Sequence, residues 1–229
     1  MARVPVKLVD WGDIVEWSLG LSNLIRESGY EPDVVIAVSR GGFVPARLLC
    51  DFLDVTNLLS IQSQHWVEAA RMAEKAILKF PYRVDLSGLK ALLVDDIVDT
   101  GDTLLLAKEF IEKEWKPGEL RVAALQWISS VAKFKPDYYY MEVSEWAWFQ
   151  YPWTRLEDTM QFITRLFREH EDLRGKAVTA EKLEEAFKEF YGIEPGSLGF
   201  YWKLALERLV EKGVLERVDG GYKLSDRSG

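Results

Sequence analysis

Cysteine and histidine are scarce in this sequence of 229 residues, which contains one cysteine, Cys50, and two histidines. A single cysteine excludes a disulfide framework, and so few thiol and imidazole groups exclude a structural zinc site of the usual kind. Cys50 lies in an apolar segment, residues 44–53, that we expect to be helical. It is therefore predicted to be a buried structural thiol.

Long apolar runs and an excess of positive charge are also absent from the sequence. No run reaches the roughly 18 apolar residues that a membrane-spanning helix needs, and the amino-terminal residues lack the apolar core of a signal peptide. The net charge is −8, whereas nucleic-acid-binding proteins usually present a basic face. We therefore expect a cytoplasmic protein that binds small molecules and neither a membrane nor nucleic acid.

Apolar segments with two different periods alternate along the first two thirds of the chain. Helical spacing predicts helices over residues 11–28 and 104–115. Short apolar runs predict strands at residues 6–9, 33–38, 57–62, 91–94, 120–128 and 137–143. Helices that alternate with buried strands are typical of an α/β fold with a mainly parallel sheet flanked by helices.

Three carboxylates, Asp95, Asp96 and Asp99, crowd the end of the apolar run at residues 91–94. A glycine and two threonines follow at the expected start of a helix, where free backbone N–H groups and the helix dipole favour a phosphate. Crowded carboxylates repel one another and resist burial, so a cation or a ligand rich in hydroxyl groups would stabilise them. A sugar phosphate with a divalent cation meets both requirements, and a capped helix beside solvated acids is the simpler alternative.

Residues 92–104, with the sequence Leu-Leu-Val-Asp-Asp-Ile-Val-Asp-Thr-Gly-Asp-Thr-Leu, resemble the phosphoribosyl-pyrophosphate (PRPP) motif of the type I phosphoribosyltransferases. The resemblance implies that Asp95 and Asp96 hold the ribose hydroxyls and, largely through ribose and water, the Mg²⁺ that accompanies PRPP. It also implies that Asp99 is the catalytic acid or base near N7 of a purine. The residues that it assigns to the 5′-phosphate are Asp99, Thr100, Gly101, Asp102 and Thr103.

A second loop with two glycines follows the strand expected at residues 33–38. Gly41 and Gly42 let the backbone approach an anion closely, and Arg40 can donate paired hydrogen bonds to phosphate oxygens. Standing alone, such a loop is an ordinary turn with a surface arginine. Beside the PRPP motif it resembles the pyrophosphate-binding loop of the same family, which implies that Ser39, Arg40 and Gly41 bind pyrophosphate. Both loops are expected at carboxyl ends of strands, where open α/β sheets bind ligands.

Residues 148–153, Trp-Phe-Gln-Tyr-Pro-Trp, resemble the hood of the bacterial xanthine-guanine phosphoribosyltransferases. The resemblance assigns the base to Trp148, Phe149 and Ile97, with the first indole stacking on a purine. Aromatic clusters also form cores and interfaces, which is the alternative here. The lysine that contacts the 6-oxo group in those enzymes is replaced by Ser129, and Lys133 or Lys135 could substitute for it. The identity of the base therefore stays open.

Residues 63–85 are polar and charged, and we expect a helix over residues 66–78. In the family a mobile loop at this position closes over the reacting centre and excludes water. A stable helix and turn is the alternative, and the sequence favours neither.

The chain continues well beyond the hood. We expect a phosphoribosyltransferase domain over residues 1–155, a connecting helix over residues 156–175 and a winged-helix-like domain over residues 176–229. In the last of these, two helices precede a hairpin that turns at residues 219–221. Winged helices often bind DNA, but this part holds nine Lys and Arg residues against ten Asp and Glu residues. Because a positive face is lacking, oligomer contacts or support of a lid are expected instead.

The sequence thus predicts a purine phosphoribosyltransferase that takes PRPP and a base, expected to be a 6-oxopurine, uses Mg²⁺, releases pyrophosphate and forms a homo-oligomer, a dimer. A regulator that senses PRPP or a nucleotide and acts through the winged-helix-like part is the alternative from another class. A third possibility keeps the enzyme and changes the base to adenine, orotate or another heterocycle. The hood disfavours orotate, and the absent lysine disfavours 6-oxopurines.

Overall fold

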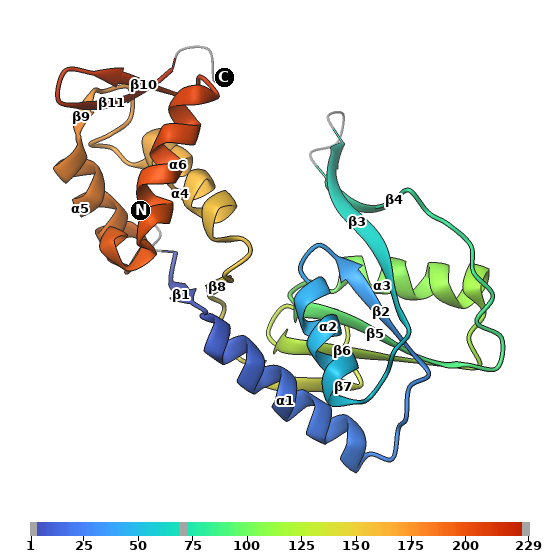
Figure 1. Ribbon diagram of the computed structural model, residues 1–229. Helices are drawn as coiled ribbons and strands as arrows, with labels where there is room; N and C mark the ends of the chain where they lie inside the picture. Colours follow the sequence, from blue (N-terminus) through green and yellow to red (C-terminus); the bar gives the residue numbers. More distant parts are fainter. Residues whose placement is uncertain (1–3, 69–72, 226–229) are drawn as a thin grey trace. The chain divides into compact units, whose positions relative to one another are not determined.

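The computed structural model describes residues 4–68 and 73–225. The chain forms two compact units, one of residues 11–146 and one that joins residues 1–10 to residues 147–229 (Figure 1). Each unit has a hydrophobic core of its own. Among the helices of the described residues, none is long and apolar enough to cross a membrane.

A six-stranded sheet forms the centre of the first unit, in the order β4-β3-β2-β5-β6-β7. Neighbouring strands are parallel except for β4, which pairs antiparallel with β3 at one edge. This sheet confirms the expected α/β fold with a mainly parallel sheet. The strands are β2 (Val34–Ser39), β3 (Leu58–Glu68), β4 (Ala73–Lys79), β5 (Lys90–Val98), β6 (Glu119–Ile128) and β7 (Tyr138–Val143).

Helices cover both faces of this sheet. Helix α1 (Trp11–Glu27) packs against α2 (Phe43–Phe52), and both contact the central strands. Helix α3 (Asp102–Phe110) continues as a π-helical turn, η1 (Ile111–Trp115), so the predicted helix over residues 104–115 is confirmed with an earlier start. Its Leu104 and Ala107 share a buried cluster with Ile36 and Leu93, which point to one face of the sheet.

The helix predicted over residues 66–78 is wrong, because residues 66–68 end β3 and residues 73–78 lie in β4, which pairs antiparallel with β3. Its alanines and charged residues favour a helix locally, but pairing at the sheet edge outweighs a preference of well under 1 kcal/mol per residue. Residues 69–72 of the proposed lid lie outside the described residues. Closure of this segment over a substrate stays a prediction.

Strand β2 lies at the point where the sheet changes its direction of winding. The chain passes from β2 through α2 to β3 on one side, whereas β5 lies on the other side of β2 and leads through α3 to β6. Right-handed crossovers in opposite directions put α2 and α3 on opposite faces and open a crevice between the carboxyl ends of β2 and β5. The sheet therefore brings the two sequence motifs to one place.

The second unit begins with a short parallel pair, β1 (Val6–Leu8) and β8 (Trp148–Gln150). The strand predicted at residues 6–9 thus exists, but it lies outside the central sheet. The remaining elements are α4 (Arg155–Glu169), β9 (Val178–Thr179), α5 (Ala180–Tyr191), η2 (Pro195–Leu198), α6 (Phe200–Glu211), β10 (Leu215–Val218) and β11 (Gly221–Leu224).

Strands β10 and β11 form the expected hairpin, in which Val218 pairs with Gly221 across a two-residue Asp219-Gly220 turn. With β9 they make a three-stranded antiparallel sheet. The order of helix, strand, two helices and hairpin supports a winged-helix-like assignment, which stays a proposal, as do the expected boundaries at residues 155 and 175. Residues 1–10 and 147–155 cluster with the C-terminal elements rather than with the central sheet.

Candidate active site

The end of β5 carries two buried carboxylates. The strand continues past its apolar run through Asp95 and Asp96 to Val98, and each of the two aspartates has 8% of its surface exposed. The backbone N–H of Asp96 donates to Asp95 Oδ1 at 2.9 Å, and that of Ile97 donates to Asp96 Oδ1 at 2.9 Å. These bonds fix the two carboxylates at the crevice between β2 and β5.

The loop after β5 leads directly into helix α3. Asp99 and Thr100 are exposed, and Asp99 Oδ1 accepts a 2.6 Å hydrogen bond from the Thr100 N–H. Gly101 adopts a left-handed φ of 84° and precedes the first turn of α3, to which it offers no side chain. The N-terminus of α3 thus faces the loop with its positive dipole end, an arrangement that favours an anion such as phosphate.

The glycine loop after β2 lies directly against the acidic strand end. A Cβ atom at Gly41 would stand 2.3 Å from Asp96 Oδ2, and one at Gly42 would stand 2.4 Å from the carbonyl oxygen of Val94. No side chain fits at either position, which explains the two glycines. Arg40, which precedes the two glycines, is exposed, and the Ser39–Arg40 peptide bond is cis. The predicted pyrophosphate and PRPP loops therefore meet, as the sequence motifs imply.

The segment after β6 packs on the PRPP loop. The Lys133 N–H donates to the Thr100 carbonyl at 3.0 Å, and Lys133 Nζ pairs with Asp102 Oδ1 at 2.5 Å. A Cβ atom at Gly101 would stand 2.7 Å from the ring of Phe134. Lys135 lies over the ring of Trp127 with its Nζ 5.3 Å from the centroid. From the sequence, Lys133 and Lys135 were expected only as replacements for the lysine that contacts the 6-oxo group of the base. No sequence pattern indicated a role for Phe134.

Burial of the strand end changes its electrostatics. Desolvation raises the pKa of Asp95 well above its usual value, and the neighbouring Asp96 carboxylate raises it further. A ligand that donates hydroxyl groups, or a cation, would favour the charged form and reverse this shift. The two carboxylates therefore suit the hydroxyl groups of a ribose together with Mg²⁺. In the described part of the chain, no group of three or more His, Cys, Asp or Glu side chains is arranged to hold a metal ion without further ligands.

Replacing Asp95 by asparagine is expected to raise the melting temperature at pH 8, by about 2–4 °C for each kcal/mol of the charge penalty that it removes. Above an ordinary pKa of about 4, the unfolded chain has released a proton that folded Asp95 still binds, so stability falls as pH rises. Asparagine has no such proton, and the gain should vanish near pH 4. Thermal unfolding of both proteins between pH 4 and 8 checks this, and a variant less stable at pH 8 would contradict it.

The residues predicted to bind the base divide between the two units. Ile97 is half-buried beside Asp96 in the first unit. Trp148 and Phe149 belong to the second unit, where they pair with Val6 and Lys7 of β1. Trp148 is half-buried, whereas Phe149 has 9% of its surface exposed and lies under the Lys7 ammonium group at 5.5 Å. Of these two aromatic residues, Trp148 keeps more surface for a ligand.

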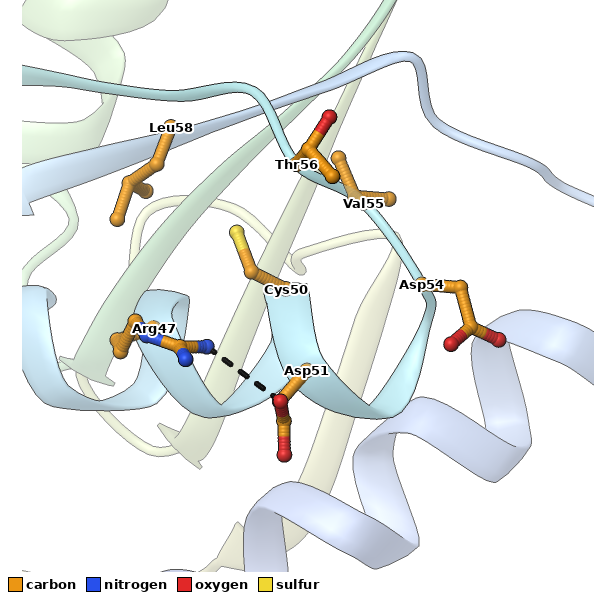
Figure 2. Close-up of a pocket in the computed structure, with 7 residues that line it drawn as sticks. All are labelled: Arg47, Cys50, Asp51, Asp54, Val55, Thr56 and Leu58. Atoms are coloured by element: carbon orange, nitrogen blue, oxygen red, sulfur yellow. Dashed lines mark ion pairs between the residues drawn. The ribbon is translucent and has the colours of Figure 1, made fainter.

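A pocket lies beside the end of α2 and the start of β3, away from the carboxyl ends of the strands (Figure 2). Its Cys50 is buried, as predicted, and burial raises the pKa of the thiol, which keeps it protonated and unreactive. The exposed side chains of Arg47 and Asp51 form an ion pair at 3.8 Å. The pocket is lined by none of the residues predicted to bind PRPP or a base, and we assign it no role.

Fold and site together define an α/β protein in which a glycine loop and an acidic strand end meet at the carboxyl ends of β2 and β5. The model of the phosphoribosyl transferase domain family matches residues 19–157. The xanthine-guanine phosphoribosyltransferase of Desulfotalea psychrophila is 33% identical over 123 residues, which cover 52% of this chain and 68% of that protein. The enzyme of the same name from Nitratidesulfovibrio vulgaris (strain DP4) is 28% identical over 160 residues, 69% of this chain and 88% of that protein.

A solved structure gives the same result. The crystal structure of a purine phosphoribosyltransferase from Pyrococcus horikoshii Ot3 superimposes with a TM-score of 0.56 and 30% identity, and the match covers 65% of this chain and 93% of that one. The chain therefore belongs to the type I phosphoribosyltransferase family.

Proposed function

We propose that this protein transfers the 5-phosphoribosyl group of PRPP to a purine base and releases pyrophosphate, as a cytoplasmic enzyme of purine salvage. The observation that carries the proposal is the contact between the two loops, in which Gly41 lies directly against the carboxylate of Asp96. A sugar that carries a phosphate at one end and a pyrophosphate at the other needs two anion sites beside hydroxyl acceptors, and this crevice supplies both kinds of group.

The ribose of PRPP is assigned to the buried strand end. Asp95 and Asp96 would accept hydrogen bonds from the 2′- and 3′-hydroxyls, and hydrogen bonds to a charged acceptor contribute about 1.5–3 kcal/mol each. Positive charge develops on the ribose ring when the bond from C1 to pyrophosphate breaks. Carboxylates fixed next to that ring stabilise this charge without reorganising during the reaction.

The two phosphate groups of PRPP are assigned to the two loops. The N-terminus of α3 with Thr100 and Thr103 would hold the 5′-phosphate, while Arg40 and the backbone at Ser39 and Gly41 would hold pyrophosphate. Lys133 pairs with Asp102 and so offsets a carboxylate that would otherwise repel the phosphate. When bound, Mg²⁺ would neutralise pyrophosphate oxygens, held mainly by the substrate with Asp95 and Asp96 acting through ribose and water.

The purine is assigned to Trp148, Phe149 and Ile97, with Asp99 moving the proton at N7. Asp99 suits this role because its carboxylate is exposed at the mouth of the loop, with one oxygen held by the Thr100 N–H. Ser129 directly follows β6 and donates its own N–H to the Val143 carbonyl at 3.0 Å. A hydroxyl at this position lacks the positive charge that a lysine would bring to a 6-oxo group, so discrimination among purines is expected to be weak.

A turnover panel tests the proposal. Purified protein would be given PRPP and Mg²⁺ with guanine, hypoxanthine, xanthine, adenine or orotate, and pyrophosphate release would be followed. We expect turnover with at least one 6-oxopurine and none with orotate. Absence of turnover with every base would overturn the enzyme proposal, and retention of a specific DNA sequence would then favour the regulator. Sedimentation at micromolar concentration tests the proposed homodimer.

A further inference from the structure

The indole of Trp148 is held by the core of the C-terminal helices. Its ring meets that of Phe162 on α4 edge to face, with centroids 5.5 Å apart and planes at 78°. Phe162 has only 4% of its surface exposed. In an edge-to-face pair at most one face of the indole is covered by the partner, so this contact fixes the tilt of Trp148 without covering both of its faces.

Phe162 is itself fixed by a column of buried aromatic rings. It stacks on Tyr191 of α5 at 4.4 Å, and the Tyr191 hydroxyl donates to the Phe162 carbonyl at 3.1 Å. The ring centroid of Phe187 lies 5.0 Å from that of Tyr191 and 4.8 Å from that of Trp202 on α6. Tyr191 and Phe187 have 1% and 0% of their surfaces exposed. Close packing of this kind leaves Phe162 no alternative position.

Strand β8 is also attached to α4, the helix that carries Phe162. Gln150 at the end of β8 donates its side-chain N–H to Thr159 Oγ1 at 3.1 Å and to the Arg155 carbonyl at 3.2 Å, both on α4. Arg155 Nη2 donates to the backbone carbonyl of Gln150 at 3.4 Å and to that of Val9 at 2.5 Å. The strand that carries Trp148 is therefore tied to α4 through its backbone as well as through its aromatic side chain.

We infer that Phe162 is a positioning residue for the base, through which the C-terminal helices set the affinity of the enzyme for its purine. This inference rests on the proposed function. The first unit binds PRPP with its own loops, so loss of the Phe162 ring acts on the base and leaves PRPP alone. The C-terminal part of the chain is on this account a component of base recognition.

The test uses the full chain and two matched leucine variants. Phe162→Leu removes the ring that touches Trp148, and Phe167→Leu removes an equally buried ring five residues further along α4. Phe162→Leu is expected to raise the KM for guanine and hypoxanthine by about 3- to 10-fold, the range of an edge-to-face pair, with the KM for PRPP unchanged. Phe167→Leu should lower the melting temperature comparably and leave both KM values near wild type.

A double-mutant cycle separates positioning from general stability. In a Trp148→Ala background, Phe162→Leu should raise the base KM no further, because its effect passes through the indole. If Phe162→Leu does not fold, Phe162→Met takes its place. An unchanged base KM, equal rises in both KM values or full additivity with Trp148→Ala would overturn the inference. Wild-type protein without turnover would instead refute the proposed function, so the two failures are distinguishable.

Discussion

Asp99→Asn is expected to lower kcat by about 100-fold, because general acid–base catalysis contributes roughly 10²–10⁴ to such rates and asparagine cannot take up or release a proton. The KM for PRPP should change little. The Asp99 side chain accepts the Thr100 N–H through one oxygen at 2.6 Å, and the amide oxygen of asparagine can accept the same bond. Steady-state kinetics with saturating base and varied PRPP measure both constants.

The matched control for Asp99→Asn is Asp54→Asn. Asp54 is an exposed carboxylate in the turn after α2, where its left-handed φ of 58° suits asparagine equally well. Its removal should leave kcat unchanged although it alters the net charge by the same amount. An unaltered kcat in Asp99→Asn would remove this carboxylate from the chemistry. A large rise in the KM for PRPP would make Asp99 a binding residue instead.

Gly41→Ala is expected to reduce kcat/KM for PRPP by about 100-fold, the cost that a displacement of about 1 Å can have in a catalytic site. The new Cβ would stand 2.3 Å from Asp96 Oδ2 and 2.6 Å from Asp96 Cγ, so the carboxylate or the loop must move. Either movement separates the acceptor for the ribose from the donors for pyrophosphate. The loss should appear in both the KM for PRPP and kcat.

Gly196→Ala is the control for this substitution. Apart from Gly196, its two chain neighbours and the backbone of η2, no atom of the described residues lies within 4 Å of a Cβ placed at this position. The change adds the same methyl group without a clash, and activity should remain at the wild-type level. Normal kinetics in Gly41→Ala would show that the glycine loop has more room than the described geometry gives it, and the contact that carries the proposed function would lose its importance.

The centre of the sheet could be predicted because β2 and β5 are buried on both faces and contain unbroken apolar runs. All six residues of β2 are buried, for example. The start of β3 was predicted as a strand at residues 57–62, but the end of β3 and strand β4 were not. The charged and alanine-containing sequence there has the composition of a helix, and the reason for its extended form is the neighbouring strand. Pairing of β1 with β8 joins segments about 140 residues apart, and such contacts leave no local pattern.

The candidate site was predicted where the residue types themselves carry the chemistry. Two adjacent aspartates and a glycine loop indicate their roles from the sequence alone, without knowledge of the residues that surround them in the fold. The structure adds how they meet, since only the strand order puts Gly41 against Asp96. Phe134 against Gly101 and Phe162 against Trp148 could not be found, because an aromatic residue in a loop or on an amphipathic helix has the same pattern whether it packs on a site or on the core.

The most direct measurement is a calorimetric titration of PRPP, in the presence of Mg²⁺, into the wild-type protein and into Asp95→Asn/Asp96→Asn. The account predicts one site per chain in the wild type and an affinity at least about 100-fold lower in the double variant, since two hydrogen bonds to charged acceptors are lost. Equal affinities, or no binding to the wild type, would contradict the claim that this pair of carboxylates recognises the sugar of PRPP.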